Sequence, residues 1–71
     1  MLYIVKDIEL DYPPGDEVIG TVEAANPKDA IIAALKAISP SMAVDMADAA
    51  RNQPDDFAKY VLAAFKAEPV A

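Results

Sequence analysis

Carboxylates are the side chains in this sequence that are numerous and clustered enough to suggest chemistry. The 71 residues include twelve Asp and Glu but six Lys and Arg, which gives a net charge of −6. The first 25 residues hold six carboxylates and one lysine, a side-chain charge of −5, whereas the rest of the chain carries −1. Carboxylates act as general acids or bases where burial or a neighbouring charge shifts their pKa. These are expected to face solvent, so the sequence predicts a binding surface.

Catalysis is disfavoured by the residue types that the chain lacks. There is no His or Cys, so neither an imidazole base nor a thiolate nucleophile is present. The run from Asp7 to Asp11 is like the start of a calcium-binding loop. However, Tyr12 and Val18 stand where such a loop needs a glycine and a bidentate glutamate. We expect no enzymatic activity, no metal site and no cofactor.

Two strands are predicted before residue 25. Residues 2–11 and 17–24 alternate and are rich in β-branched and aromatic side chains, and the Pro-Pro-Gly sequence between them is typical of a turn. The short connection predicts an antiparallel hairpin. Lys6 has the same parity as the expected inward residues, so a bend or bulge is expected near Lys6 and Asp7. The expected inward face consists of Ile4, Ile8, Leu10, Val18 and Val22.

Three helices are predicted after the hairpin. Asn26-Pro27 is a helix start, with a helix to about residue 38. Ser39-Pro40-Ser41 ends that helix, and either serine can cap a second helix from about Met42 to Arg51. A third helix is predicted for residues 55–67, with Pro69 ending it. The expected apolar face of this helix is Phe57, Val61, Leu62 and Phe65. We therefore predict one α+β domain over residues 1–71, a two-stranded antiparallel hairpin followed by three helices (ββααα).

The expected hairpin places its acids in a row. Asp7, Glu9 and Asp11 point to one face of the first strand, about 6.6–6.8 Å apart. Phosphates along a DNA strand are on the order of 7 Å apart, so the row is hypothesised to imitate a phosphate backbone. If Asp11 lies opposite Glu17, Glu17 and Glu23 share that face. The predicted partner-binding set is Asp7, Glu9, Asp11, Asp16, Glu17, Glu23 and the outward-facing Asp45 and Asp48 of the second helix.

The charge balance also restricts the class of partner. With six cations, direct binding of nucleic acid or of an anionic membrane is not expected, and a basic protein surface is the expected partner. No apolar run reaches about 18 residues and no signal peptide is recognisable, which predicts a cytoplasmic protein. A monomer is expected. Three alternatives remain: an adaptor for another basic protein, a homo-oligomer paired through the open hairpin edge, and a solvated acidic face that only maintains solubility.

Residues 23–30, Glu-Ala-Ala-Asn-Pro-Lys-Asp-Ala, form a strand-to-helix junction common in small phage proteins. With its size, acidity and hairpin-then-helices order, the whole chain resembles the small phage-encoded anti-CRISPR proteins. Within that group it is most similar to the acidic inhibitors of type I systems, type I-C among them, that are thought to mimic double-stranded DNA. The resemblance implies stoichiometric binding to the DNA-recognition surface of a CRISPR surveillance complex, with carboxylates in the sites for target-DNA phosphates.

Overall fold

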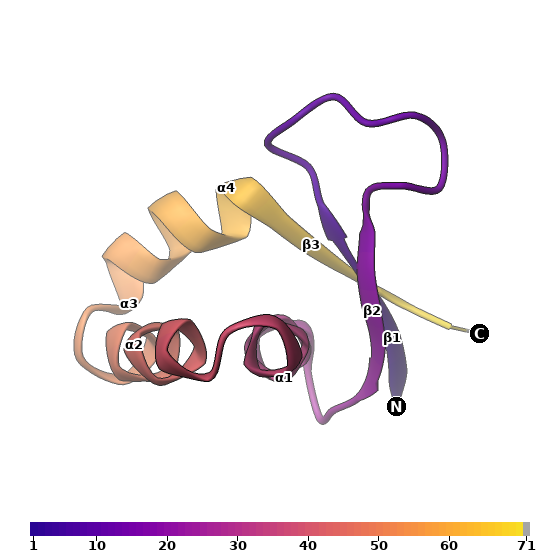
Figure 1. Ribbon diagram of the computed structural model, residues 1–71. Helices are drawn as coiled ribbons and strands as arrows, with labels where there is room; N and C mark the ends of the chain where they lie inside the picture. The colour runs from indigo at the N-terminus through magenta and orange to yellow at the C-terminus, as the bar shows by residue number, and fades with distance from the viewer. Residues whose placement is uncertain (71) are drawn as a thin grey trace.

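Three antiparallel strands form one sheet in the order β2-β1-β3 (Figure 1). The computed structural model describes residues 1–70 of the chain. The strands are β1 (Leu2–Asp7), β2 (Val18–Glu23) and β3 (Phe65–Pro69). The predicted hairpin pairs β1 with β2, and β3 brings the other end of the described chain to the free side of β1.

The third strand corrects the predicted topology. Residues 65–67 were expected to end a helix, but they belong to β3, where Ala67 lies opposite Val5 and Glu68 opposite Ile4. Pairing with the open side of β1 satisfies backbone groups over a whole strand, which outweighs the helical preference of Lys66 and Ala67. The α+β class is confirmed, and the two-stranded ββααα arrangement is wrong.

The helical part begins where the sequence predicts. The elements are α1 (Pro27–Ile38), α2 (Pro40–Asn52), α3 (Pro54–Asp56), a π-helical turn η1 (Phe57–Val61) and α4 (Leu62–Ala64). The Asn26 side chain accepts a hydrogen bond from the Asp29 N–H at 2.9 Å, and Ser39 Oγ accepts one from the Met42 N–H at 3.4 Å. Each cap residue is followed by a proline at the first helical position, as expected for a helix N-terminus.

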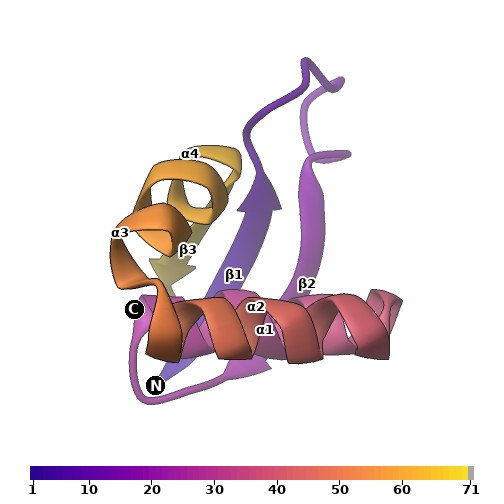
Figure 2. The ribbon, with the colours of Figure 1, turned by 90° about the vertical axis from the view of Figure 1, so that its left-hand side faces the viewer.

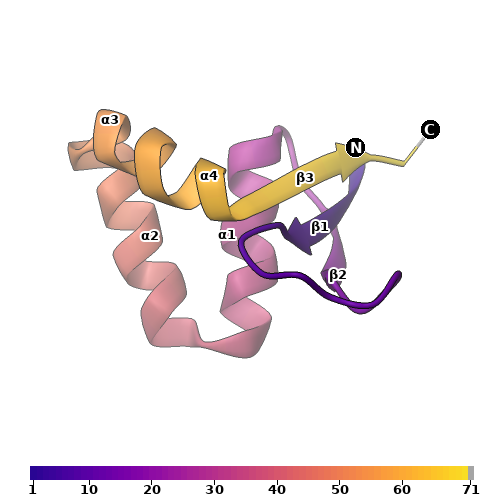
Figure 3. The same ribbon diagram turned by 90° about the horizontal axis from the view of Figure 1, so that it is seen from above.

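All helices lie on the same side of the sheet, and α1 packs across its three strands. Figure 2 shows α1 and α2 crossing near one end of the strands, and Figure 3 shows every helix on one side of the sheet. The core lies between the sheet and the helices, and no helix within residues 1–70 lies over the opposite sheet face. The buried residues are Tyr3, Val5, Ala30, Ile31, Ala34, Leu35, Ala43, Phe57 and Val61.

The inward face of β1 is the reverse of the prediction. Tyr3 and Val5 are buried, while Ile8 and Leu10 lie beyond the strand and are exposed. Residues 2–5 are all apolar, so the period-two pattern fits either face and gives no preference. The predicted inward face rests on Ile8 and Leu10, which lie outside β1.

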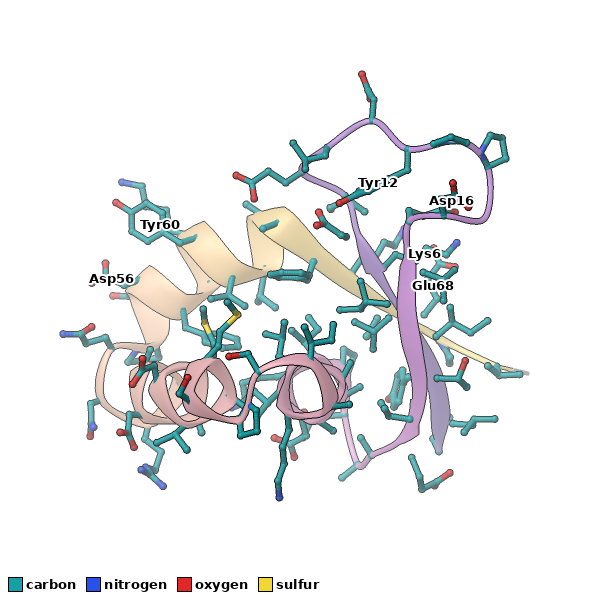
Figure 4. The ribbon with its side chains drawn as sticks, viewed as in Figure 1. Lys6, Tyr12, Asp16, Asp56, Tyr60 and Glu68 are labelled. Carbon is teal, nitrogen blue, oxygen red and sulfur yellow. The ribbon has the colours of Figure 1, made fainter. Side chains whose placement is uncertain are left out.

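The predicted bulge is present. Val5 pairs with Gly20 whereas Lys6 pairs with Val18, which leaves Ile19 as an extra residue in β2. Ile19 packs against the core. Lys6 lies close to Glu68 (Figure 4), and their side chains form an ion pair at 3.2 Å. Hydrogen bonds from Lys6 and Lys66 hold the pKa of Glu68 below its usual value.

Candidate functional site

The connection between β1 and β2 is an acidic loop, residues 8–17, which projects beyond the ends of the strands (Figure 1). Three of its carboxylates, Glu9, Asp11 and Asp16, are on exposed residues and are called the loop carboxylates below. The sequence has no Lys or Arg between Lys6 and Lys28. In the part of the chain that the structure describes, none of the loop carboxylates forms an ion pair. The loop therefore presents uncompensated negative charge.

Two further carboxylates shape the loop from within. Asp7, at the end of β1, accepts hydrogen bonds from the Glu9 N–H at 3.0 Å and from the Tyr12 hydroxyl at 3.2 Å. Glu17 accepts one from the Gly15 N–H at 2.8 Å. Asp7 and Glu17 thus have structural roles, and they hold the backbone that carries the loop carboxylates.

Tyr12 belongs to this loop, and its surroundings raise the pKa of its hydroxyl. Loss of hydration raises the pKa of Tyr12 above its usual value, and the charge of Asp7, its hydrogen bond and the charge of Glu9 raise it further. The hydroxyl therefore stays protonated over the physiological range and keeps donating to Asp7. Figure 4 shows the Tyr12 side chain lying under the loop, with Asp16 toward the other end of the loop.

Gly15 fixes the tip of the loop. Its φ is +94°, a conformation that side chains with a Cβ rarely adopt, and the Asp16 N–H closes the turn onto the Pro13 carbonyl at 3.0 Å. Pro13 and Pro14 restrict the backbone just before it. The loop is thus ordered by local chemistry rather than by burial.

Substitution of the two glycines is expected to give opposite results. Gly15→Ala should lower the free energy of unfolding by about 1–2 kcal/mol because of its positive φ. Gly20→Ala should be neutral or stabilising by up to about 1 kcal/mol, since the added Cβ would meet only Ala34 Cβ at 3.9 Å. Urea denaturation followed by circular dichroism measures both. Equal stability of the two variants would contradict the loop conformation described above.

The predicted row of carboxylates along a strand is wrong. Only Asp7 belongs to β1, and the Asp7 N–H donates to the Glu17 carbonyl at 2.9 Å, so Asp11 does not lie opposite Glu17. Glu23 is at the far end of β2, where it pairs with the amino group of Met1. The structure therefore brings Asp7, Glu9, Asp11, Asp16 and Glu17 together at the loop and leaves Glu23 apart from them.

Asp45 and Asp48 are also separate from the loop. Both are exposed on α2, which lies at the opposite end of the molecule from the loop (Figure 1). Together with Asn52 and Gln53 they line a shallow hollow of about 230 Å³, and Asp48 pairs with Arg51. These two residues do not extend the loop surface.

Sequence reasoning missed the apolar part of the site. Ile8 and Leu10 were expected in the core, but they are 49% and 62% exposed and alternate with Glu9 and Asp11. Glu9 also lines a hollow of about 260 Å³ with Lys59, Tyr60, Ala63 and Ala64, so the loop borders η1 and α4. The Ile8 N–H donates to the Ala64 carbonyl at 2.8 Å and fixes this border. Alternation of apolar and acidic residues over 8–11 predicts a strand. The same alternation also fits a loop, so the pattern alone does not show that Ile8 and Leu10 are buried.

No protein-family model, curated protein or solved structure matches the chain. Its function therefore has to follow from its own residues. Over residues 1–70, no three His, Cys, Asp or Glu side chains are grouped so that they could hold a metal ion. Across the same range, none of the helices has the length and apolar character needed to cross a bilayer.

Proposed function

We propose that this protein acts by binding, with the acidic loop docking on a basic surface that normally holds nucleic acid. The observation that carries the proposal is the set of three exposed loop carboxylates that no cation neutralises within residues 1–70. Like charges held close together repel each other, and complementary charge on a partner relieves that repulsion. A partner with several Arg or Lys side chains around a groove provides this complement.

In its specific form the proposal is that the protein inhibits a type I CRISPR–Cas surveillance complex by occupying part of its target-DNA site. The resemblance of the sequence to acidic phage inhibitors supports it. The structure changes the form that mimicry would take, because the acids are grouped on a protruding loop and not spaced along a strand. The loop would enter a phosphate-binding groove end-on, with Glu9, Asp11 and Asp16 in phosphate positions.

A second function, an adaptor for another basic host protein, is favoured by one observation. The exposed Ile8 and Leu10 lie on either side of Glu9 in the sequence, and Asp11 follows Leu10. Burying an apolar side chain in a protein pocket stabilises a complex by about 25 cal/mol per Å². A groove that only binds phosphates would bury little of these side chains. The adaptor has the same acidic surface but a partner outside the CRISPR system. The third strand changes the edge-pairing alternative. Because β3 covers the side of β1 that the hairpin leaves free, the open edges of the sheet are β2 and β3.

Competition with target DNA tests the inhibitor proposal. Purified type I surveillance complexes, type I-C first, are mixed with labelled target duplex at increasing concentrations of this protein. We expect DNA binding to fall at stoichiometric protein, and the inhibition to weaken as salt is raised. The protein alone should not shift the duplex. Unchanged DNA binding by complexes of several type I subtypes would overturn the proposed inhibition, and the adaptor function would remain.

A further inference from the structure

An apolar groove runs between α1 and α2. It has a volume of about 300 Å³ and is lined by Ile32, Lys36, Pro40, Ala43, Val44 and Ala47. Val44 is 60% exposed, and the other lining residues apart from Lys36 are apolar. None of the residues that line it belongs to the acidic loop.

The groove opens on the side of the molecule opposite the acidic loop. Met46 packs against the core, and Val44 lies two residues away from it, which is about 200° around the helix. Val44 therefore faces away from η1 and α4. In Figure 1, α1 and α2 form the lower layer and the loop is at the top, so the two surfaces are at opposite ends.

The border of the groove on α1 is positively charged. Lys28, Ile32 and Lys36 are spaced four residues apart and so follow one face of the helix. Both lysines are exposed, and within residues 1–70 neither forms an ion pair. The groove thus combines an apolar lining with the cation of Lys36, and Lys28 lies one helical turn beyond the lining residue Ile32. The segment that complements it has one or two apolar side chains next to carboxylates.

The acidic loop of the chain has this composition. Residues 8–11 read Ile-Glu-Leu-Asp, with both apolar side chains exposed and both carboxylates free of ion pairs in the described chain. We propose that the groove binds the acidic loop of a second copy of this protein, with Leu10 in the apolar groove and Glu9 and Asp11 facing Lys36 and Lys28. This contact goes beyond the proposed function and does not depend on it.

The positions of the two surfaces set the form of the assembly. The contact joins different surfaces of the two copies, and each copy keeps one free loop and one free groove. Because the surfaces lie at opposite ends, the contact does not close into a twofold dimer and adds copies in a row. Assembly covers Glu9 and Asp11, so it would compete with any basic partner of the acidic loop.

Sedimentation equilibrium over low micromolar to millimolar protein tests the proposal. We expect the weight-average mass to rise continuously with concentration and to fall toward the monomer mass as salt is raised. Lys36→Glu and Glu9→Lys should each weaken association about tenfold, since each places like charges across the contact. Thermal melts establish that both variants are folded, which is expected because both side chains are exposed.

The decisive measurement is sedimentation of a mixture of the two variants. In the mixture, the groove of the Lys36→Glu variant meets the loop of the Glu9→Lys variant, so the two charges are opposite again. The groove of the Glu9→Lys variant meets the loop of the Lys36→Glu variant, and both of these surfaces are native. An equimolar mixture should therefore regain the wild-type mass. Lys66→Glu is the charge-matched control on β3 and should associate like the wild type. A monomer at all concentrations, a mass that levels off at a dimer, or a mixture no larger than its components would each overturn the proposal. A failure here leaves the competition with target DNA untouched, so the two proposals are tested separately.

Discussion

Phe57→Ala is expected to lower the free energy of unfolding by about 3–5 kcal/mol. The Phe57 side chain is 2% exposed and is the largest apolar side chain among the buried residues. It belongs to η1, where its carbonyl accepts the Leu62 N–H, and it joins the last helical segment to the core. A domain of this size has a total stability of roughly 4–10 kcal/mol. Urea denaturation should therefore show a variant that is barely folded or unfolded at 25 °C.

Two other aromatic residues provide controls for this prediction. Phe65 lies in β3 and is partly buried, so Phe65→Ala should cost clearly less than Phe57→Ala. Tyr60 is 64% exposed, and Tyr60→Ala should change the stability by no more than about 0.5 kcal/mol. If Phe57→Ala unfolds at the same urea concentration as Tyr60→Ala, the core does not contain Phe57 as described.

The helix starts could be predicted because their chemistry is local. Asn26 and Ser39 each stand before a proline and accept a backbone N–H three residues on. A side-chain cap needs only four consecutive residues, so the sequence contains all the information. Ile38 at the end of α1 and Met42 in the first turn of α2 are exposed although both side chains are apolar.

The third strand could not be predicted because its cause is distant in the sequence. Ala67 and Glu68 pair with Val5 and Ile4, more than sixty residues away along the chain. The segment 65–69 has no β-branched residue, so its own preference does not favour a strand. The free side of β1 decides its conformation, and that side exists only after the hairpin has formed.

The candidate site was predictable in composition and not in arrangement. The sequence shows that the carboxylates concentrate before residue 25 and that no cation lies between Lys6 and Lys28. Which of them face a partner depends on the strand end at Asp7, the bulge at Ile19 and the positive φ of Gly15. These features turned an expected row on a strand into a cluster on a loop, and they separated Glu23 from it.

Reversing the three loop carboxylates should abolish binding to the proposed partner. We expect Glu9→Lys, Asp11→Lys and Asp16→Lys together to weaken inhibition of target-DNA binding at least about 100-fold, which corresponds to about 2.8 kcal/mol. The reason is that like charges facing a basic groove cost several kcal/mol. Single neutralisations such as Glu9→Gln should cost about 0.2–1 kcal/mol, because exposed charges act through their summed field. The triple variant should remain folded, since Asp7 and Glu17 keep the hydrogen bonds that shape the loop.

A matched control separates position from net charge. Asp45→Lys, Asp55→Lys and Asp56→Lys also change three exposed carboxylates, so both triple variants move the formal net charge from −6 to 0. Asp55 and Asp56 are in the first turn of α3, and losing favourable charge there costs up to about 1 kcal/mol each, so a thermal melt must accompany the assay. The control should inhibit within about threefold of the wild type, because α2 and α3 lie away from the loop. Equal inhibition by wild type and by the loop triple would show that the acidic loop is not the binding surface, and equal loss in both triples would show that only net charge matters.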